Sequence, residues 1–456
     1  FLYSKHKVAA DAVDGAAQVI NAGLNVRTNF SLPENFIYPL RHAISEGKIS
    51  MQTIDSRVAE VLRVKFMMGL FDNPYKGDTK KLEKVVHCKE HQNVSMRAAL
   101  ESIVLLKNEN NILPLSKSIK KVAVIGPNAA EVDNLICRYG PANAPIKTVY
   151  QGIKDYLPDS EVRYAKGADI IDEYFPESEL YDVPLNKTEE TMIDEAVALA
   201  KESDVAIMVL GGNEKTVREE YSRTNLDLCG RQEKLLQAVY ATGKPVILVM
   251  IDGRAATINW AERYIPGIVH AWFPGEFMGD AIAKVIFGDY NPGGKLAVTF
   301  PRSVGQIPFA FPFKPGSDSK GFVRVTGSLY PFGYGLSYTT FDYSALKIEN
   351  PVIGTQGSVK LSCRVKNTGK IAGDEVVQLY LHDEVSSVTT YVKVLRGFER
   401  IHLQPGEEKV VDFVLTPQDM GLWNKDNHFI VEPGTFAVMV GSSSQDIRLQ
   451  GKFEVK

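Results

Sequence analysis

At 456 residues the chain is too long for one hydrophobic core, and about two to four domains are expected. Hydrophobic residues make up 44% of it and charged residues 23%, as in an average globular protein. The net charge is −3 with no basic tract, and no apolar run approaches the roughly 18–20 residues of a membrane span. The sequence therefore predicts no nucleic-acid partner and no membrane partner.

The first segment, residues 1–70, has helical periodicity interrupted by one short strand pattern. Helical spacing is seen at 4–22, 35–46 and 53–68, and Leu24–Thr28 has the pattern of a strand. One strand and three amphipathic helices leave apolar faces uncovered. The segment is therefore predicted to be the end of a larger α/β domain that begins before Phe1.

Residues 71–117 are rich in lysine and glutamate and are predicted to be a linker leading into a helix near 90–105. In residues 118–320 short apolar strand patterns then alternate with helical ones. The strand patterns are 122–127, 161–167, 205–212, 245–253, 268–275 and 295–301, and the helical ones are 188–203, 230–242 and 277–287. This alternation predicts a doubly wound parallel sheet with helices on both faces.

The C-terminal quarter of the chain changes to a period of two. After a connector at 321–341, the residues Val359, Leu361, Cys363 and Val365 share one face of a predicted strand, and further short strands follow. Residues 342–456 are therefore predicted to form a β-sandwich of immunoglobulin-like type.

A polar loop with three carboxylates follows the most apolar strand pattern. The run 205–210 stops at a glycine pair and leads to Glu214, Glu219 and Glu220. Ligands of open α/β sheets bind beyond the carboxyl ends of the strands, so this loop is a candidate for acid–base chemistry. The alternative is a solvated loop without a chemical role.

Other candidate groups have simpler explanations. Asp252 is expected to cap the turn after its strand or to form an ion pair with Arg254. Glu276 is expected to lie in the first turn of a helix. Trp272 and Phe273 would suit stacking on a sugar, or burial at a strand end. Residues 124–130, VIGPNAA, lack the glycine and lysine patterns of a phosphate cradle. Since the four cysteines are also widely spaced, no cofactor and no metal are expected.

Three long motifs resemble glycoside hydrolase family 3. They are HAWFPGEFMGDAIAKVIFGDYNPGGKLAVTFPRSVGQIP at 270–308, YPFGYGLSYTTFDYS at 330–344 and IDSRVAEVLRVKFMMGLFDNP at 54–74. The resemblance covers essentially the whole chain. It implies the tail of a TIM-type barrel, an α/β sandwich and a fibronectin type III-like domain, in that order.

The resemblance also implies a pair of catalytic carboxylates. The family's nucleophile is an aspartate on a barrel strand that precedes the segment beginning here, so it is expected upstream of this chain, which alone should be inactive. The acid/base is a glutamate four residues before an arginine or aspartate that leads into an L-x-L-like run. That position is Glu219, with Arg223 and LDL at 226–228; Glu214 and Glu220 are the alternatives.

The function implied is exo-hydrolysis of β-linked oligosaccharides or glycosides with retention. Release of terminal β-D-glucosyl residues is the first expectation, and β-xylosidase activity is the second. Asn25 and Arg27 follow the predicted strand and are candidates to line the sugar site. The competing class is a non-catalytic carbohydrate-binding or scaffold protein. A periplasmic or secreted location is expected, and the sequence leaves homodimer formation open.

Overall fold

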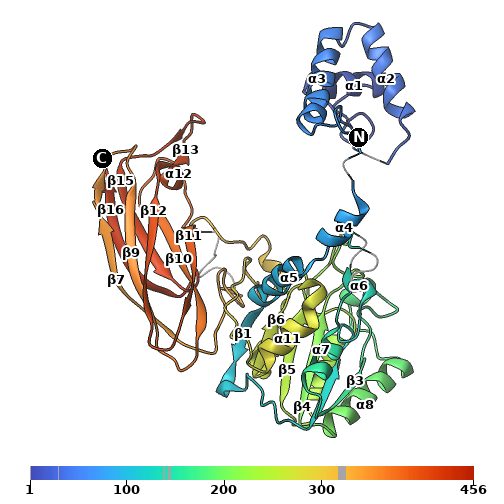
Figure 1. Ribbon diagram of the computed structural model, residues 1–456, viewed down its shortest axis with the longest axis vertical. Coiled ribbons are helices and arrows are strands. Elements are labelled where there is room, and N and C mark those ends of the chain that lie inside the picture. Colours follow the sequence, from blue (N-terminus) through green and yellow to red (C-terminus); the bar gives the residue numbers. More distant parts are fainter. Residues whose placement is uncertain (1, 29, 76, 137–138, 142–144, 317–324) are drawn as a thin grey trace. The chain divides into compact units, whose positions relative to one another are not determined.

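The computed structural model describes residues 2–28, 30–75, 77–136, 139–141, 145–316 and 325–456 (Figure 1). The chain folds as two compact units, Phe1–Lys89 and Glu90–Lys456. None of the described helices is both long and apolar enough to cross a membrane.

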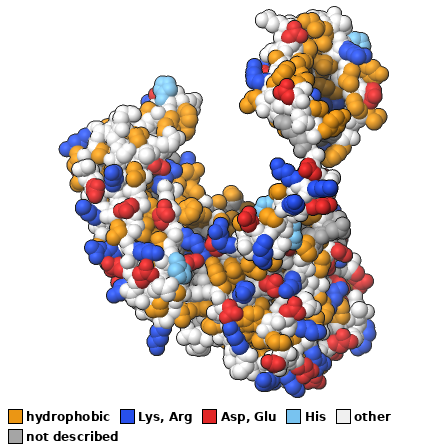
Figure 2. Space-filling view, viewed as in Figure 1, with side chains coloured by type: hydrophobic (Ala, Val, Ile, Leu, Met, Phe, Trp, Pro, Cys, Tyr) orange, Lys and Arg blue, Asp and Glu red, His pale blue; other side chains and the backbone are white. Residues whose placement is uncertain are grey.

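The first unit is helical and has a small core. Its helices are α1 Ala12–Asn21, α2 Glu34–Ser45, α3 Met51–Met67 and α4 Thr79–Val85. The two longer helices confirm the predictions at 35–46 and 53–68, whereas α1 covers only part of 4–22. The fully buried apolar side chains are few, and α3 buries none of its residues. Figure 2 shows the resulting spread of hydrophobic side chains on the visible surface of this unit.

The strand predicted at Leu24–Thr28 is not formed. These residues have no regular secondary structure, and the described part of the first unit contains no other strand with which they could form hydrogen bonds. An apolar strand pattern becomes a strand only when a neighbour satisfies its backbone N–H and C=O groups.

The second unit begins with a six-stranded sheet of order β1-β6-β5-β4-β2-β3. Its strands are β1 Val104–Asn108, β2 Lys121–Ile125, β3 Glu161–Ala165, β4 Val205–Gly211, β5 Val246–Ile251 and β6 Gly267–His270. Strands β2 to β6 are parallel, as predicted, and β1 joins β6 antiparallel.

Helices cover both faces of this sheet. One face carries α5 Lys89–Ser102, α7 Val149–Tyr156 and α11 Met278–Ile286; the other carries α8 Lys187–Lys201, α9 Gln232–Tyr240 and α10 Asn259–Tyr264. Alternate residues of β4 enter the two cores, since Val205, Ile207 and Val209 face one and Ala206, Met208 and Leu210 face the other. Burial on both faces explains why β4 is apolar throughout.

Two further predictions, one of a helix and one of a strand, differ from the structure. The apolar run that begins at Ile103 was expected to end a helix, yet α5 stops at Ser102 and the run forms the edge strand β1. The run 295–301 was expected to be a strand, yet it stays outside the sheet. Its backbone pairs with the 330–334 segment, through Leu296 with Tyr334 and Phe300 with Tyr330.

The C-terminal part is a β-sandwich, as expected. One sheet has the order β11-β10-β15-β16-β8 and the other β12-β9-β7. The strands are β7 Phe341–Glu349, β8 Val352–Ile353, β9 Val359–Asn367, β10 Gly373–Asp383, β11 Val394–Leu403, β12 Glu408–Leu415, β15 Gly434–Gly441 and β16 Ile447–Val455. The four alternating residues predicted on β9 all face the core and are at most 2% exposed.

One buried histidine makes the stability of the α/β sandwich depend on pH. His270 ends β6, is fully buried between Trp272 and Phe300, and neither ring nitrogen has a hydrogen-bond partner among the described residues. Burial lowers the pKa of His270 from 6.5 to about 3. Between these pH values the unfolded chain binds a proton that the folded chain does not, so acid destabilises the fold.

We predict that the free energy of unfolding falls by up to about 1.4 kcal/mol per pH unit between pH 6 and pH 4 because of His270. Denaturant unfolding at several pH values measures this, and His270→Leu should flatten the dependence. The exposed His428 provides the control. An equal flattening in His428→Leu, or none in His270→Leu, would contradict the assignment.

Candidate active site

The site is built at the carboxyl end of β4, where the chain must leave the sheet. Gly211 has φ +132°, and a Cβ there would lie 2.1 Å from the carbonyl oxygen of Ile251, so only glycine fits. The Gln232 side chain of α9 then pairs with both backbone groups of Gly211, at 2.8 and 2.9 Å. Strand β4 therefore ends at a fixed point.

A tight turn follows and carries the first carboxylate. Asn213 starts the turn: its carbonyl accepts the N–H groups of Thr216 and Val217, and its side chain contacts Asn128. The Glu214 carboxylate binds the Arg218 guanidinium at 3.2 Å. The ion pair with Arg218 holds this carboxylate at the start of the loop.

Glu219 is more open than Glu214. Its side chain is exposed and accepts a hydrogen bond from the phenol of Tyr139. Glu220 beside it has φ +73°, a backbone conformation rare for residues other than glycine. The loop thus presents an exposed carboxylate that accepts a hydrogen bond from a phenol. Such a group can pass a proton to a bound molecule and take one back.

A buried ion pair anchors the far end of this loop. The Arg223 Nε donates to Glu179, and both side chains are at most 6% exposed. Glu179 also accepts from the backbone N–H and hydroxyl of Thr224, at 3.0 and 2.7 Å. Burial raises the pKa of Glu179, but these hydrogen bonds and the charge of Arg223 hold it below its usual value.

Asp252 supports the same loop from β5. Its carboxylate accepts the N–H of Arg254 at 3.0 Å, which confirms the predicted cap, and the two residues form no ion pair. The Arg254 guanidinium instead donates to the Tyr221 carbonyl at 2.6 Å. Burial raises the pKa of Asp252 to about 6. The hydrogen bond from the N–H of Arg254 and the positive charges of Arg223 and Arg254 lower this pKa, but burial has the larger effect.

The remaining candidates lie elsewhere. Asn25 and Arg27 belong to the first unit, where Asn25 donates to Glu60 at 3.0 Å and Arg27 stacks on Phe36. Glu276 lies in a short 3-10 turn before α11, as its sequence position suggested. Trp272 packs its ring against His270.

Metal ligands do not converge in the described residues. His87 and His91 have the i, i+4 spacing of helical zinc ligands. Because α5 begins only at Lys89, His87 lies outside the helix and the two residues do not share a helical face. No group of three or more His, Cys, Asp or Glu side chains among the described residues could hold a metal.

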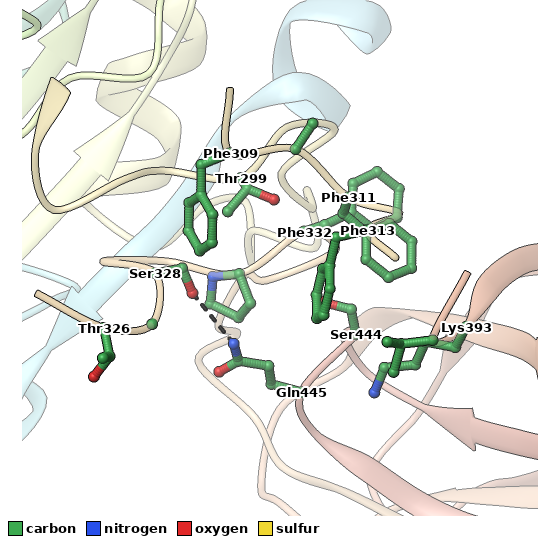
Figure 3. Close-up of a pocket in the computed structure, with 14 residues that line it drawn as sticks. Thr299, Phe309, Phe311, Phe313, Thr326, Ser328, Phe332, Lys393, Ser444 and Gln445 are labelled. Carbon is green, nitrogen blue, oxygen red and sulfur yellow. Dashed lines mark hydrogen bonds between the residues drawn. The ribbon is translucent and has the colours of Figure 1, made fainter. Parts of the chain in front are cut away.

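A separate hollow of about 430 Å³ lies between residues 299–313 and 326–332 on one side and loops of the β-sandwich on the other (Figure 3). Its walls carry four phenylalanines: Phe309, Phe311, Phe313 and Phe332. Gln445 donates to Ser328 at 3.3 Å across one wall. None of its lining residues belongs to the carboxylate loop.

Two family profiles match this combination of an α/β sandwich and a β-sandwich. The profile of the glycosyl hydrolase family 3 C-terminal domain matches residues 103–338, and that of the fibronectin type III-like domain matches residues 375–444. The chain belongs to glycosyl hydrolase family 3.

The similar proteins have longer sequences than this chain. A β-xylosidase of Formosa agariphila is 40% identical over 97% of the chain and 61% of its own length. The periplasmic β-glucosidase of Salmonella typhimurium is 38% identical over 99% of the chain and 61% of its own length. The solved β-glucosidase of Erythrobacter marinus superposes with a TM-score of 0.91 at 36% identity, covering 100% of this chain and 62% of that one. The chain thus spans about three fifths of the curated relatives it matches.

The loop can be recognised in the sequence, but two residues that contact it cannot. Tyr139 and Glu179 lie 80 and 44 residues from their partners Glu219 and Arg223. No local pattern marks either residue, since the contacts depend on how β2, β4 and their connections are placed in the sheet.

We predict that Glu179→Gln destabilises the second unit by about 3–5 kcal/mol, because Arg223 would keep its charge in a buried place without a counter-ion. Denaturant unfolding measures the loss. Glu190→Gln, which removes the partner of an exposed ion pair with Lys187, should cost at most about 1 kcal/mol. Equal effects of the two substitutions would show that the buried pair does not anchor the loop.

Proposed function

We propose that this chain provides the acid/base part of a retaining β-glycosidase that releases terminal β-D-glucosyl residues from oligosaccharides or glycosides. Glu219 is the general acid/base. The observation that carries the proposal is the exposed Glu219 carboxylate, bonded to a phenol at the end of β4, in a chain that belongs to this glycosidase family.

The chemistry divides between two carboxylates. One carboxylate attacks the anomeric carbon through an oxocarbenium-like transition state. In retaining enzymes the two carboxyl groups lie about 5–5.5 Å apart. Glu219 protonates the departing glycosidic oxygen, so that a neutral alcohol leaves. It then removes a proton from the water that attacks the glycosyl-enzyme. The attacking carboxylate is not assigned to any residue of this chain.

Exposure and backbone geometry favour Glu219 over its neighbours. Glu219 is exposed, the Glu214 side chain is only 14% exposed, and Glu220 takes the unusual backbone conformation that turns the chain. The anchors at Arg223 and Arg254 keep the loop in one conformation, so the proton donor is positioned before the substrate binds.

A β-xylosidase is the second candidate, favoured by the 40% identical relative that carries that name. The two sugars differ by one hydroxymethyl group. The ratio of kcat/KM for aryl β-glucosides and β-xylosides distinguishes them, and we expect the glucoside to be preferred. Export from the cytoplasm is supported by the relative named as periplasmic. A non-catalytic binding protein would turn over neither substrate.

We predict that Glu219→Gln in the full-length gene product slows hydrolysis of glycosides with poor leaving groups by about 100- to 10,000-fold. Glycosides with a dinitrophenyl leaving group need little protonation, so their first step should be nearly spared and the glycosyl-enzyme should accumulate. Azide needs no deprotonation and should restore turnover, giving a β-glycosyl azide.

Glu214→Gln and Glu220→Gln are the matched controls and should lack this combination. Loss of a sugar contact alone would weaken all substrates more evenly. Azide rescue in the Glu214 variant alone would move the assignment there. Rescue in none of the three would make the carboxylates of the loop structural.

A further inference from the structure

A second hollow, of about 570 Å³, opens at one end of the β-sandwich. It lies where β10 ends and β11 begins, beside the short elements α12 Pro417–Met420 and β13 Leu422–Trp423 (Figure 1). Its volume falls within the range of about 300–1,000 Å³ typical of small-molecule sites. None of its lining residues belongs to the carboxylate loop.

Arg396 lines this hollow. The Nε of Arg396 is buried and has no hydrogen-bond partner among the described residues. Arg396 also stands at a β-bulge, because Leu395 and Gly397 pair with consecutive residues of β10. Bulges turn a side chain away from the regular alternation and are frequent beside binding sites. An arginine side chain carries five N–H donors, so Arg396 supplies hydrogen-bond donors to the lining of the hollow.

Acidic and aromatic side chains also line the hollow. Asp383 ends β10, and burial raises the pKa of this half-buried carboxyl. Tyr391 and Trp423 are 42% and 66% exposed. Lys314 lies 6.0 Å from the centre of the Tyr391 ring. Aromatic rings with one exposed face bury the apolar face of a sugar ring, and the polar groups beside them bind its hydroxyls.

We propose that this hollow is a non-catalytic binding site for a neutral β-linked polysaccharide. Groups of both charges line it, Lys314 and Arg396 against Asp383 and Asp419, so a charged ligand would meet a like charge. A sugar hydroxyl both donates and accepts, and therefore satisfies Arg396 and Asp383 together. The site holds the polymer, while cleavage takes place at the proposed catalytic loop, and the choice of a β-linked polymer rests on the proposed function.

The test is native gel electrophoresis of the full-length protein in gels containing soluble mixed-linkage β-glucan or β-xylan, with α-linked dextran as the control polymer. The parent protein should be retarded by a β-linked polymer and not by dextran. Trp423→Ala and Arg396→Met, which keeps an apolar stem, should each raise the dissociation constant about tenfold or more. Phe398→Ala, an exposed aromatic on β11 outside the hollow, is the matched control and should change nothing.

Two further measurements separate this site from the catalytic one. Hydrolysis of small aryl glycosides should be unchanged in the Trp423 and Arg396 variants, whereas Glu219→Gln should lose turnover and keep its retardation. Thermal unfolding of each variant confirms that it is folded. Absence of retardation in the parent, or equal retardation in the folded Trp423, Arg396 and Phe398 variants, would overturn the proposal.

Discussion

The end of β4 is the constraint on which the site depends. The strand is buried on both faces, so the chain must leave the sheet at its carboxyl end, and Gly211 leaves no room for a side chain against Ile251. Gln232 fixes that point from α9. Two contacts fix the polar loop that follows this point: the turn at Asn213 and the buried ion pair of Arg223 with Glu179. The loop can therefore carry exposed carboxylates without losing its conformation.

The sequence predicts most of this framework because the dominant signals are local. The apolar run of β4, the helical periods of α8, α9 and α11, and the alternation along β9 each report which face is buried, and each is confirmed. The failures are equally physical. The run that became β1 and the run at 295–301 are both short and apolar, and periodicity cannot tell a strand from another buried segment. Leu24–Thr28 has the pattern of a strand but no described neighbour to pair with.

The candidate site is likewise predicted in part from the sequence and in part only visible in the structure. The loop and its three glutamates are visible from spacing, and the structure places them together at one strand end. The structure adds what spacing cannot give: Glu214 is engaged by Arg218, Glu219 is hydrogen-bonded to Tyr139, and Glu179 holds Arg223 from a segment far away in the sequence. Asn25 and Arg27, in contrast, are bound to neighbours within the first unit, and their role at a sugar site stays a prediction.

The central claim is that Glu219 donates the proton to the leaving group. The most direct measurement is the pH dependence of kcat/KM for a glycoside with a poor leaving group, because its alkaline limb reports loss of the essential acid. The account predicts that this limb, present in the parent protein, is absent in Glu219→Gln and kept in Glu220→Gln. An alkaline limb that persists unchanged in Glu219→Gln would contradict it.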